Sequence, residues 1–186
     1  TGSKPGLYGS MFTINPKVDD LPDTLAREVD GIKVMTRGGV KKGGGGCICP
    51  ESTMLKNSIM HLVLARDEVI IMDMEAGLEH LGRATATGVD HLIVVVEPGQ
   101  RSLETAHVVR KLATDLNLKR VSVVGNKIRN KSDEDFIKKE LSDMEVLGFI
   151  PLADSIIEAD RQGASVYKKS PEAAKAVKEI FDKINV

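Results

Sequence analysis

Aromatic side chains are scarce in this chain of 186 residues: they make up 3% of it, and tryptophan is absent. A core must therefore be built from Val, Ile, Leu, Met and Ala, and the overall hydrophobic content of 41% is ordinary for a globular protein. A surplus of one charge is also lacking, because the formal net charge is −1. This balance gives no reason to expect nucleic acid or an anionic membrane as a partner. No apolar run approaches the roughly 20 residues of a membrane span, so none is expected.

The sequence has neither an initiator methionine nor a signal peptide pattern, which would place charged residues before an apolar run. It starts at Thr1 in a stretch, residues 1–31, that is rich in Pro, Gly and Asp and shows no sustained period. We expect a truncated chain from a cytoplasmic protein.

Cysteine is nearly absent, and the two that exist, Cys47 and Cys49, close a glycine-rich loop over residues 37–49. Without a secretion signal, this spacing indicates metal or redox chemistry rather than a structural disulfide. Two thiolates suit Zn²⁺, Ni²⁺ or Cu⁺ but cannot complete a tetrahedral site. A two-fold dimer that apposes two such loops would supply four ligands. A surface dithiol and a strained local disulfide remain alternatives.

Apolar strands alternate with helical patterns along the chain. The expected strands cover residues 32–35, 68–74, 91–96, 120–124 and 146–150. The expected helices cover residues 79–86, 102–116, 133–141 and 172–184, with a further one that Pro50 opens. The strands are continuously apolar, which indicates a mostly parallel sheet buried by helices on both faces. No repeat or linker interrupts residues 1–186, so we expect a single α/β domain.

The strand expected at residues 68–74 ends in a carboxylate, Asp73, and Gly77 follows a few residues later. Ligands of open parallel sheets bind beyond the carboxyl ends of the strands. Asp73 at such an end has the form of a Walker B carboxylate that would hold the water shell of Mg²⁺. The alternative is a turn former or helix cap, which Asp often is.

Two further strand ends carry groups that suit a purine base. Asn126 can both donate and accept, and the stem of Lys127 can lie along a ring. Arg129 stands at the position where a GTPase has the Asp that recognises guanine. The absence of this Asp favours adenine. Ile150 and Pro151 end the next strand and would face the flat base. The alternative at Gly-Asn is an ordinary turn.

The phosphate-binding motif G-x-x-x-x-G-K-[ST] is not found in this sequence. Gly38 and Gly43 have its spacing, but Gly44 and Gly45 then stand where Lys and Ser or Thr are needed. The loop therefore lacks the phosphate-directed ammonium and the Mg²⁺ hydroxyl. We therefore do not assign this loop as a phosphate-binding loop.

Several runs together resemble the CooC family, the MinD/ParA-type ATPases that mature nickel carbon monoxide dehydrogenase. These runs are GGGGCICP at residues 43–50, DMEAGLEHLGR at 73–83, VEPGQRS at 96–102, GNKIRN at 125–130 and EADR at 158–161. The resemblance covers almost the whole chain, and the cysteine pair separates it from a generic MinD or ParA protein.

The resemblance implies a P-loop NTPase fold of the SIMIBI type that lacks its amino-terminal βαβ portion here. It implies an ATPase that forms a homodimer, binds ATP or ADP with Mg²⁺ and helps to insert nickel into carbon monoxide dehydrogenase. Because the phosphate-binding lysine and the Mg²⁺ hydroxyl of the family lie in the missing portion, we expect the chain as it stands to be inactive as an ATPase. Asp73 then serves as the Walker B carboxylate, while Glu75 and Gly77 belong to switch II.

The remaining roles implied by the resemblance lie at the base and at the metal. Asn126 and Lys127 would contact the adenine, beside Ile150 and Pro151. Cys47 and Cys49 of each protomer would bind Ni²⁺ or Zn²⁺ in one shared site. Two alternatives remain open: another MinD/ParA-type ATPase such as an iron–sulfur cluster carrier, and a non-catalytic metal-binding dimer.

Overall fold

Three stretches of the chain, residues 26–35, 69–74 and 89–184, are described by the computed structural model. The chain divides into two compact units, Thr1–Glu75 and Ala76–Val186, each with its own sheet. The single domain expected over residues 1–186 stays a prediction.

In the first unit, β1 (Arg27–Val29) and β2 (Ile32–Val34) form an antiparallel hairpin. Its turn is Asp30-Gly31, with φ values of 51° and 81°. Positive φ at both central residues defines the type I′ turn, for which Asp-Gly is a favoured pair. The strand expected at residues 32–35 is confirmed over Ile32–Val34. Residues 1–31 were expected to form a loop with short ordered pieces; β1 is such a piece, and the Asp-Gly pair is the signal that could have located it.

The expected strand at residues 68–74 is wrong over its described part, because residues 69–74 form no strand. Val69 is 58% exposed and Ile71 is 87% exposed. A continuous apolar run becomes a buried strand only where neighbouring strands accept its backbone hydrogen bonds. Within the described part of the chain, these residues have no such neighbour.

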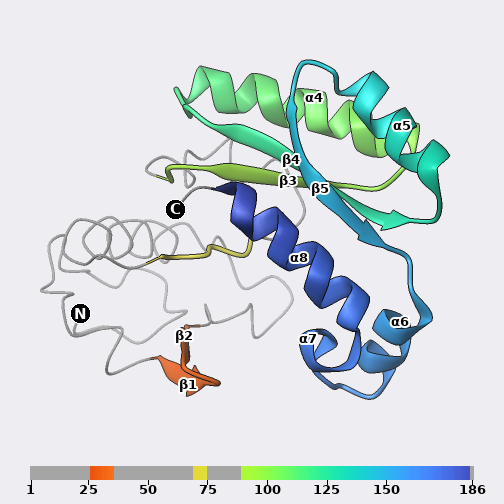
Figure 1. Cartoon of the computed structure of the whole chain (residues 1–186). Helices are drawn as coiled ribbons and strands as arrows, with labels where there is room; N and C mark the ends of the chain where they lie inside the picture. Colours follow the sequence, from red (N-terminus) through yellow and green to blue (C-terminus); the bar gives the residue numbers. More distant parts are fainter. Residues whose placement is uncertain (1–25, 36–68, 75–88, 185–186) are drawn as a thin grey trace, which may run out of the picture. The chain divides into compact units, whose positions relative to one another are not determined.

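The second unit contains a parallel sheet of three strands in the order β3-β4-β5 (Figure 1). The strands are β3 (Leu92–Val96), β4 (Val121–Ile128) and β5 (Glu145–Pro151). The helices are α4 (Gln100–Asp115), α5 (Lys131–Glu140), α6 (Asp154–Arg161), α7 (Val166–Lys169) and α8 (Pro171–Ile184). The parallel sheet predicted from the apolar strands is confirmed.

Helices cover both faces of this sheet: α4 and α5 lie on one face and α8 on the other (Figure 1). Alternation along β4 explains the two layers, since successive side chains of a strand point to opposite faces. Val123 joins the buried cluster of Leu103 and Ile137 from α4 and α5. Val124 joins the smaller cluster that contains Ile180 from α8.

Two helices begin earlier than expected, and a side-chain cap explains the start of α5. α4 begins after Gly99 rather than after Ser102. α5 begins at Lys131 because the Asn130 side chain accepts a hydrogen bond from Asp133 N at 3.1 Å. The short helices α6 and α7 were not expected, and β4 continues past the expected end at residue 124.

β3 is the outer strand of the described sheet, and one of its faces is uncovered. Ile93 is 37% exposed and Val95 is 60% exposed. Burial of this strand on both faces was expected, but α8 packs against β5 instead. Among the described residues, therefore, the apolar run of β3 is buried on one face only.

Candidate functional site

The carboxyl ends of β3, β4 and β5 lie at one edge of the parallel sheet, the edge where such sheets bind ligands (Figure 1). Pro98 follows β3, Asn126 lies near the end of β4, and Pro151 is the last residue of β5. Ile150 precedes Pro151 and is partly buried. We call this region the carboxyl edge. It brings together the residues predicted at the base.

β4 bulges where it reaches this edge. It advances from Gly125 to Ile128 while β5 advances only from Phe149 to Pro151, so β4 carries one extra residue. Bulges are rare between parallel strands and often re-aim side chains beside a functional site. Lys127 lies in the bulge with φ of 57°, a left-handed conformation that side chains with a Cβ rarely adopt.

An ion pair links the ends of two strands at this edge. Lys127 Nζ lies 2.6 Å from Oε1 of Glu97, the residue that directly follows β3. Glu97 is also fixed through its own backbone: its N–H donates to Ser102 Oγ at 3.0 Å, and its carbonyl accepts from Gly99 N at 2.8 Å. Sequence reasoning missed Glu97, because a pair between strand ends needs a known sheet order.

The Asn126 side chain has one end already engaged. Its Oδ1 accepts a hydrogen bond from Lys127 N at 2.9 Å. The amide NH₂ group therefore remains as the donor that a ligand can use. A donor beside an aliphatic stem suits a flat heterocycle with an acceptor nitrogen, such as a purine.

Charged groups just beyond β4 satisfy each other. Asp133 accepts from Arg129 N and Nε, both at 3.0 Å, and from Arg129 Nη2 at 3.1 Å. These hydrogen bonds lower the pKa of the Asp133 carboxyl below its ordinary value. Arg129, which stands where a guanine-reading Asp would be, is thus held by Asp133.

The opposite, amino edge of the sheet carries a hydrogen-bonded chain that sequence reasoning also missed. Ser122 Oγ donates to Glu145 Oε2 at 2.7 Å and lies 2.8 Å from His91 Nε2. Because the single hydroxyl proton goes to Glu145, Nε2 of His91 is the donor to Ser122. His91 Nδ1 is buried and has no partner among the described residues. This chain ties three strands together, away from the carboxyl edge.

Burial and the nearby Arg120 lower the pKa of His91, while Glu145 acts in the opposite direction. Protonation would place a new donor at the buried Nδ1, which agrees with a lowered pKa. His91 is therefore a neutral structural group.

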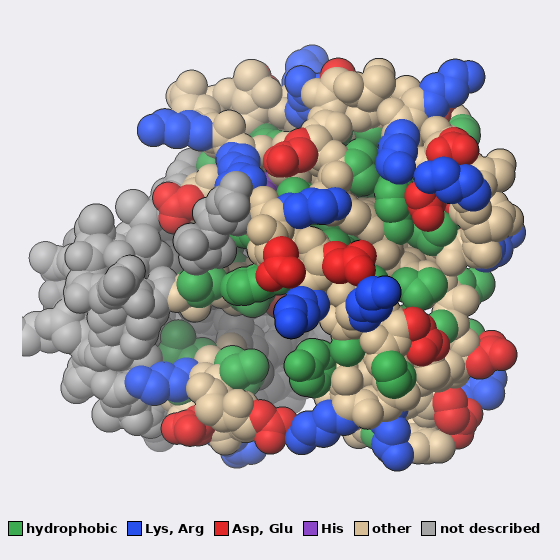
Figure 2. All heavy atoms as spheres, viewed as in Figure 1, with side chains coloured by type: hydrophobic (Ala, Val, Ile, Leu, Met, Phe, Trp, Pro, Cys, Tyr) green, Lys and Arg blue, Asp and Glu red, His purple; other side chains and the backbone are tan. Residues whose placement is uncertain are grey.

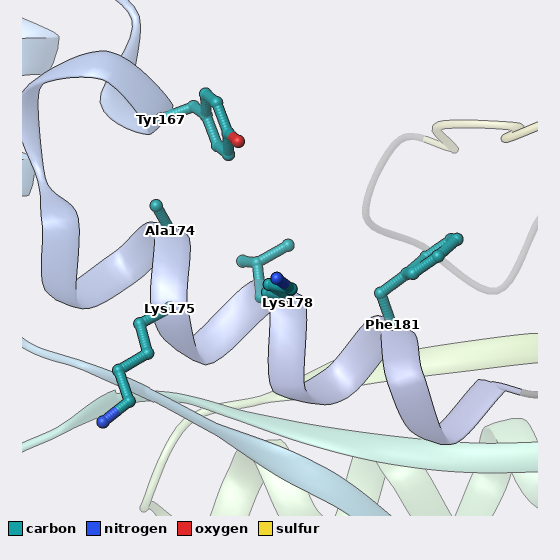
Figure 3. Close-up of a pocket in the computed structure, with 6 residues that line it drawn as sticks. Tyr167, Ala174, Lys175, Lys178 and Phe181 are labelled. Carbon is teal, nitrogen blue, oxygen red and sulfur yellow. The ribbon is translucent and has the colours of Figure 1, made fainter.

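A hollow of about 440 Å³ lies on α7 and α8 (Figure 3). Ala174 and Phe181 point from α8 to the side where Tyr167 of α7 lies, and Lys178 also lines the hollow. It shares no residue with the carboxyl edge, so we do not assign the nucleotide to it. On the face shown in Figure 2, positive and negative side chains are mixed over the described residues, without a patch of one sign.

The other predicted site residues lie outside the second unit as it is described, so their place at the carboxyl edge stays a prediction. Cys47, Cys49, Glu75 and Gly77 lie outside the described residues. Asp73 is exposed and belongs to the first unit, so its expected place at this edge stays a prediction. Within residues 26–35, 69–74 and 89–184, no group of three or more His, Cys, Asp or Glu side chains could hold a metal ion.

Comparison with known proteins gives a close sequence relative. An uncharacterized ATP-binding protein of Methanocaldococcus jannaschii is 46% identical over 99% of this chain and 72% of its own length. CooC, the carbon monoxide dehydrogenase accessory protein of Rhodospirillum rubrum, is 40% identical over 88% of this chain and 62% of its own length. The chain belongs to the family of ATP-binding proteins that the archaeal relative represents, and it is similar to CooC.

Solved structures show that the fold of this chain is similar to that of MinD and ParA proteins. The ParA family ATPase of Chlorobium tepidum covers 89% of this chain with a TM-score of 0.65 at 20% sequence identity, and the match spans 69% of that structure. The cell division protein MinD of Aquifex aeolicus covers 72% of this chain with a TM-score of 0.58 at 17% identity, over 60% of its own chain. No protein-family model matches the chain.

The chain spans 62% of CooC and 72% of the archaeal relative, so activities of the whole proteins are not carried over directly. None of the helices in the part of the chain that the structure describes has the length and apolar character of a membrane span.

Proposed function

We propose that this protein is an ATP-dependent metallochaperone that helps to insert nickel into carbon monoxide dehydrogenase. The observation that carries the proposal is the 40% identity with CooC, over 88% of the chain. A cytoplasmic homodimer with one shared metal site is part of the same proposal.

The carboxyl edge supports the nucleotide part of this proposal. Asn126 offers an amide donor, Lys127 an aliphatic stem, and Ile150 and Pro151 an apolar surface on the neighbouring strand. These groups fit an adenine base of ATP or ADP, because they bind its acceptor nitrogens and its flat face. Hydrolysis of ATP bound with Mg²⁺ would supply the free energy that returns the dimer to its starting state.

We assign the remaining roles from the similarity to CooC. Asp73 holds the water shell of Mg²⁺, and Glu75 and Gly77 form the switch that responds to the terminal phosphate. Cys47 and Cys49 of two protomers bind the cargo ion, Ni²⁺ or Zn²⁺, with four thiolates. Such a closed tetrahedral set is typical of soft thiolate sites.

Metal stoichiometry measured together with sedimentation tests the shared site. We expect one divalent ion per two protomers, with dimer formation that a chelator reverses. Cys47→Ser and Cys49→Ser should each abolish binding, because one substitution removes two of four ligands. Binding should also weaken as the pH falls, since protons compete for the thiolates. One ion per monomer, or a dimer that is indifferent to chelator and to both substitutions, would contradict the shared site.

The same sample separates the alternatives. A bridging iron–sulfur cluster would give visible absorption and bound sulfide, whereas a thiolate Zn²⁺ site is colourless. The non-catalytic metal-binding dimer would bind the metal but no adenine nucleotide. This result should then hold even for a longer chain that carries a phosphate-binding motif.

A further inference from the structure

The bulge of β4 holds a residue in a backbone conformation that its side chain disfavours. Lys127 has φ of 57°, and glycine would adopt this conformation without steric cost. A strained backbone conformation persists only where surrounding contacts stabilise it, and such conformations are frequent at ligand-binding sites. The question is which contacts hold Lys127.

Two contacts hold Lys127, and one of them comes from Glu97, the residue that follows β3. Its backbone N–H donates to Asn126 Oδ1 at 2.9 Å, and its Nζ lies 2.6 Å from Glu97 Oε1. Glu97 is itself anchored at the start of α4, through Ser102 Oγ and Gly99 N. The ion pair therefore ties the Lys127 side chain to a fixed point at the end of β3.

This arrangement determines which polar groups a base would meet. The backbone N–H of Lys127 takes Asn126 Oδ1, so the amide presents its NH₂ donor. The carboxylates of Glu97 and Asp133 are engaged by Lys127 and Arg129. Guanine needs an acceptor for its N1–H and its exocyclic amine, whereas adenine offers acceptor nitrogens to an amide donor.

We propose that Glu97 is a positioning residue for base recognition. Through its ion pair it holds Lys127 in the left-handed conformation, so that the Asn126 amide and the Lys127 stem receive an adenine rather than a guanine. This inference rests on the proposed function, because it concerns the base site assigned there.

Adenosine and guanosine are suitable probes, because both lack phosphates and therefore report on the base site alone. Their affinities for the 186-residue chain are measured by calorimetry or NMR titration. Glu97→Gln keeps the size of the side chain and removes the charge. We expect it to weaken adenosine binding about two- to fivefold, the scale of an exposed ion pair, and to reduce the preference over guanosine. The thermal midpoint should hardly move.

Asp143→Asn is the matched control. Asp143 also forms an exposed inter-element ion pair, with Arg110 of α4, and its side chain is 54% exposed against 52% for Glu97. Asp143 lies in the turn between α5 and β5, at the amino end of β5 and away from the carboxyl edge, so its loss should leave adenosine binding unchanged.

Lys127→Gly separates positioning from ordinary stabilisation. Glycine relieves the strain at φ of 57°, so the thermal midpoint should rise or stay, while adenosine affinity falls. If the ion pair only stabilised the fold, the thermal midpoint and the adenosine affinity would change in the same direction.

The possible outcomes are distinct. Unchanged adenosine affinity and selectivity in Glu97→Gln would overturn the inference and leave the base site intact. Equal losses in Glu97→Gln and Asp143→Asn would also overturn it, because the effect would then be general. Failure of the unsubstituted chain to bind adenosine would overturn the base site of the proposed function, and this inference with it.

Discussion

Gly125→Ala should destabilise the second unit, because β4 and β5 meet there without space for a side chain. A Cβ on Gly125 would lie 2.5 Å from Phe149 Cδ1, 2.9 Å from Phe149 Cε1 and 3.1 Å from Ile137 Cδ1. Ile137 is fully buried, so it has little room to yield. Phe149 is the strand partner of Gly125 in β5 and has to move.

The magnitude follows from two opposing effects. Overpacking a core typically costs about 1–3 kcal/mol. Alanine reduces the freedom of the unfolded chain, which offsets about 0.4–1 kcal/mol where the backbone conformation suits it. We therefore expect the free energy of unfolding to fall by about 1–2 kcal/mol.

Urea unfolding followed by circular dichroism measures this change. Gly99→Ala is the control, since a Cβ at Gly99 would meet nothing within 4 Å, and its effect should stay within about 0.5 kcal/mol. Phe149→Leu should relieve the clash in the Gly125→Ala variant. The double variant should therefore lose about 1 kcal/mol less of its free energy of unfolding than the two single losses add up to. Equal effects of Gly125→Ala and Gly99→Ala, or a strictly additive cycle, would refute the predicted close packing.

Two further predictions concern pH and catalysis. Burial lowers the pKa of His91 in the folded state, so the unfolded chain binds this proton more tightly. Stability should therefore fall as the pH drops from about 6.5 to the lowered pKa, and then level off. His91→Gln should remove this slope in urea unfolding across pH 5–8, and an unchanged slope would contradict the assignment. The purified 186-residue chain should show no ATP turnover, since its sequence has no G-x-x-x-x-G-K-[ST] motif, whereas a longer chain that carries the motif should turn ATP over. Phosphate release that Asp73→Ala abolishes in the 186-residue chain would contradict this prediction.

The sequence predicted the parts of the second unit that depend on local pattern. Continuous apolar runs identified β3 and β5, and the order of elements indicated a parallel sheet. Asn126 and Pro151 were expected at one edge because each follows an apolar run, and parallel strands end on the same side.

Other features depend on contacts between distant residues and left no local signal. The bulge at Lys127 arises from register against β5, so Gly125-Asn126-Lys127 looked like the end of β4. The Glu97–Lys127 pair joins two strands that are adjacent only once the sheet order is known. The hydrophobic run at residues 69–74 predicted a strand wrongly, since an apolar pattern does not itself supply a pairing partner.

Amide chemical-shift mapping with ADP tests the central claim, that the carboxyl edge of the parallel sheet binds an adenine nucleotide. The ¹⁵N-labelled chain is titrated with ADP, with inorganic phosphate alone as the control. We predict shifts that saturate with ADP at Asn126, Lys127 and Ile150, and that phosphate does not reproduce. Shifts confined to the hollow at Tyr167 and Phe181, or no saturable shift at the carboxyl edge, would contradict the claim.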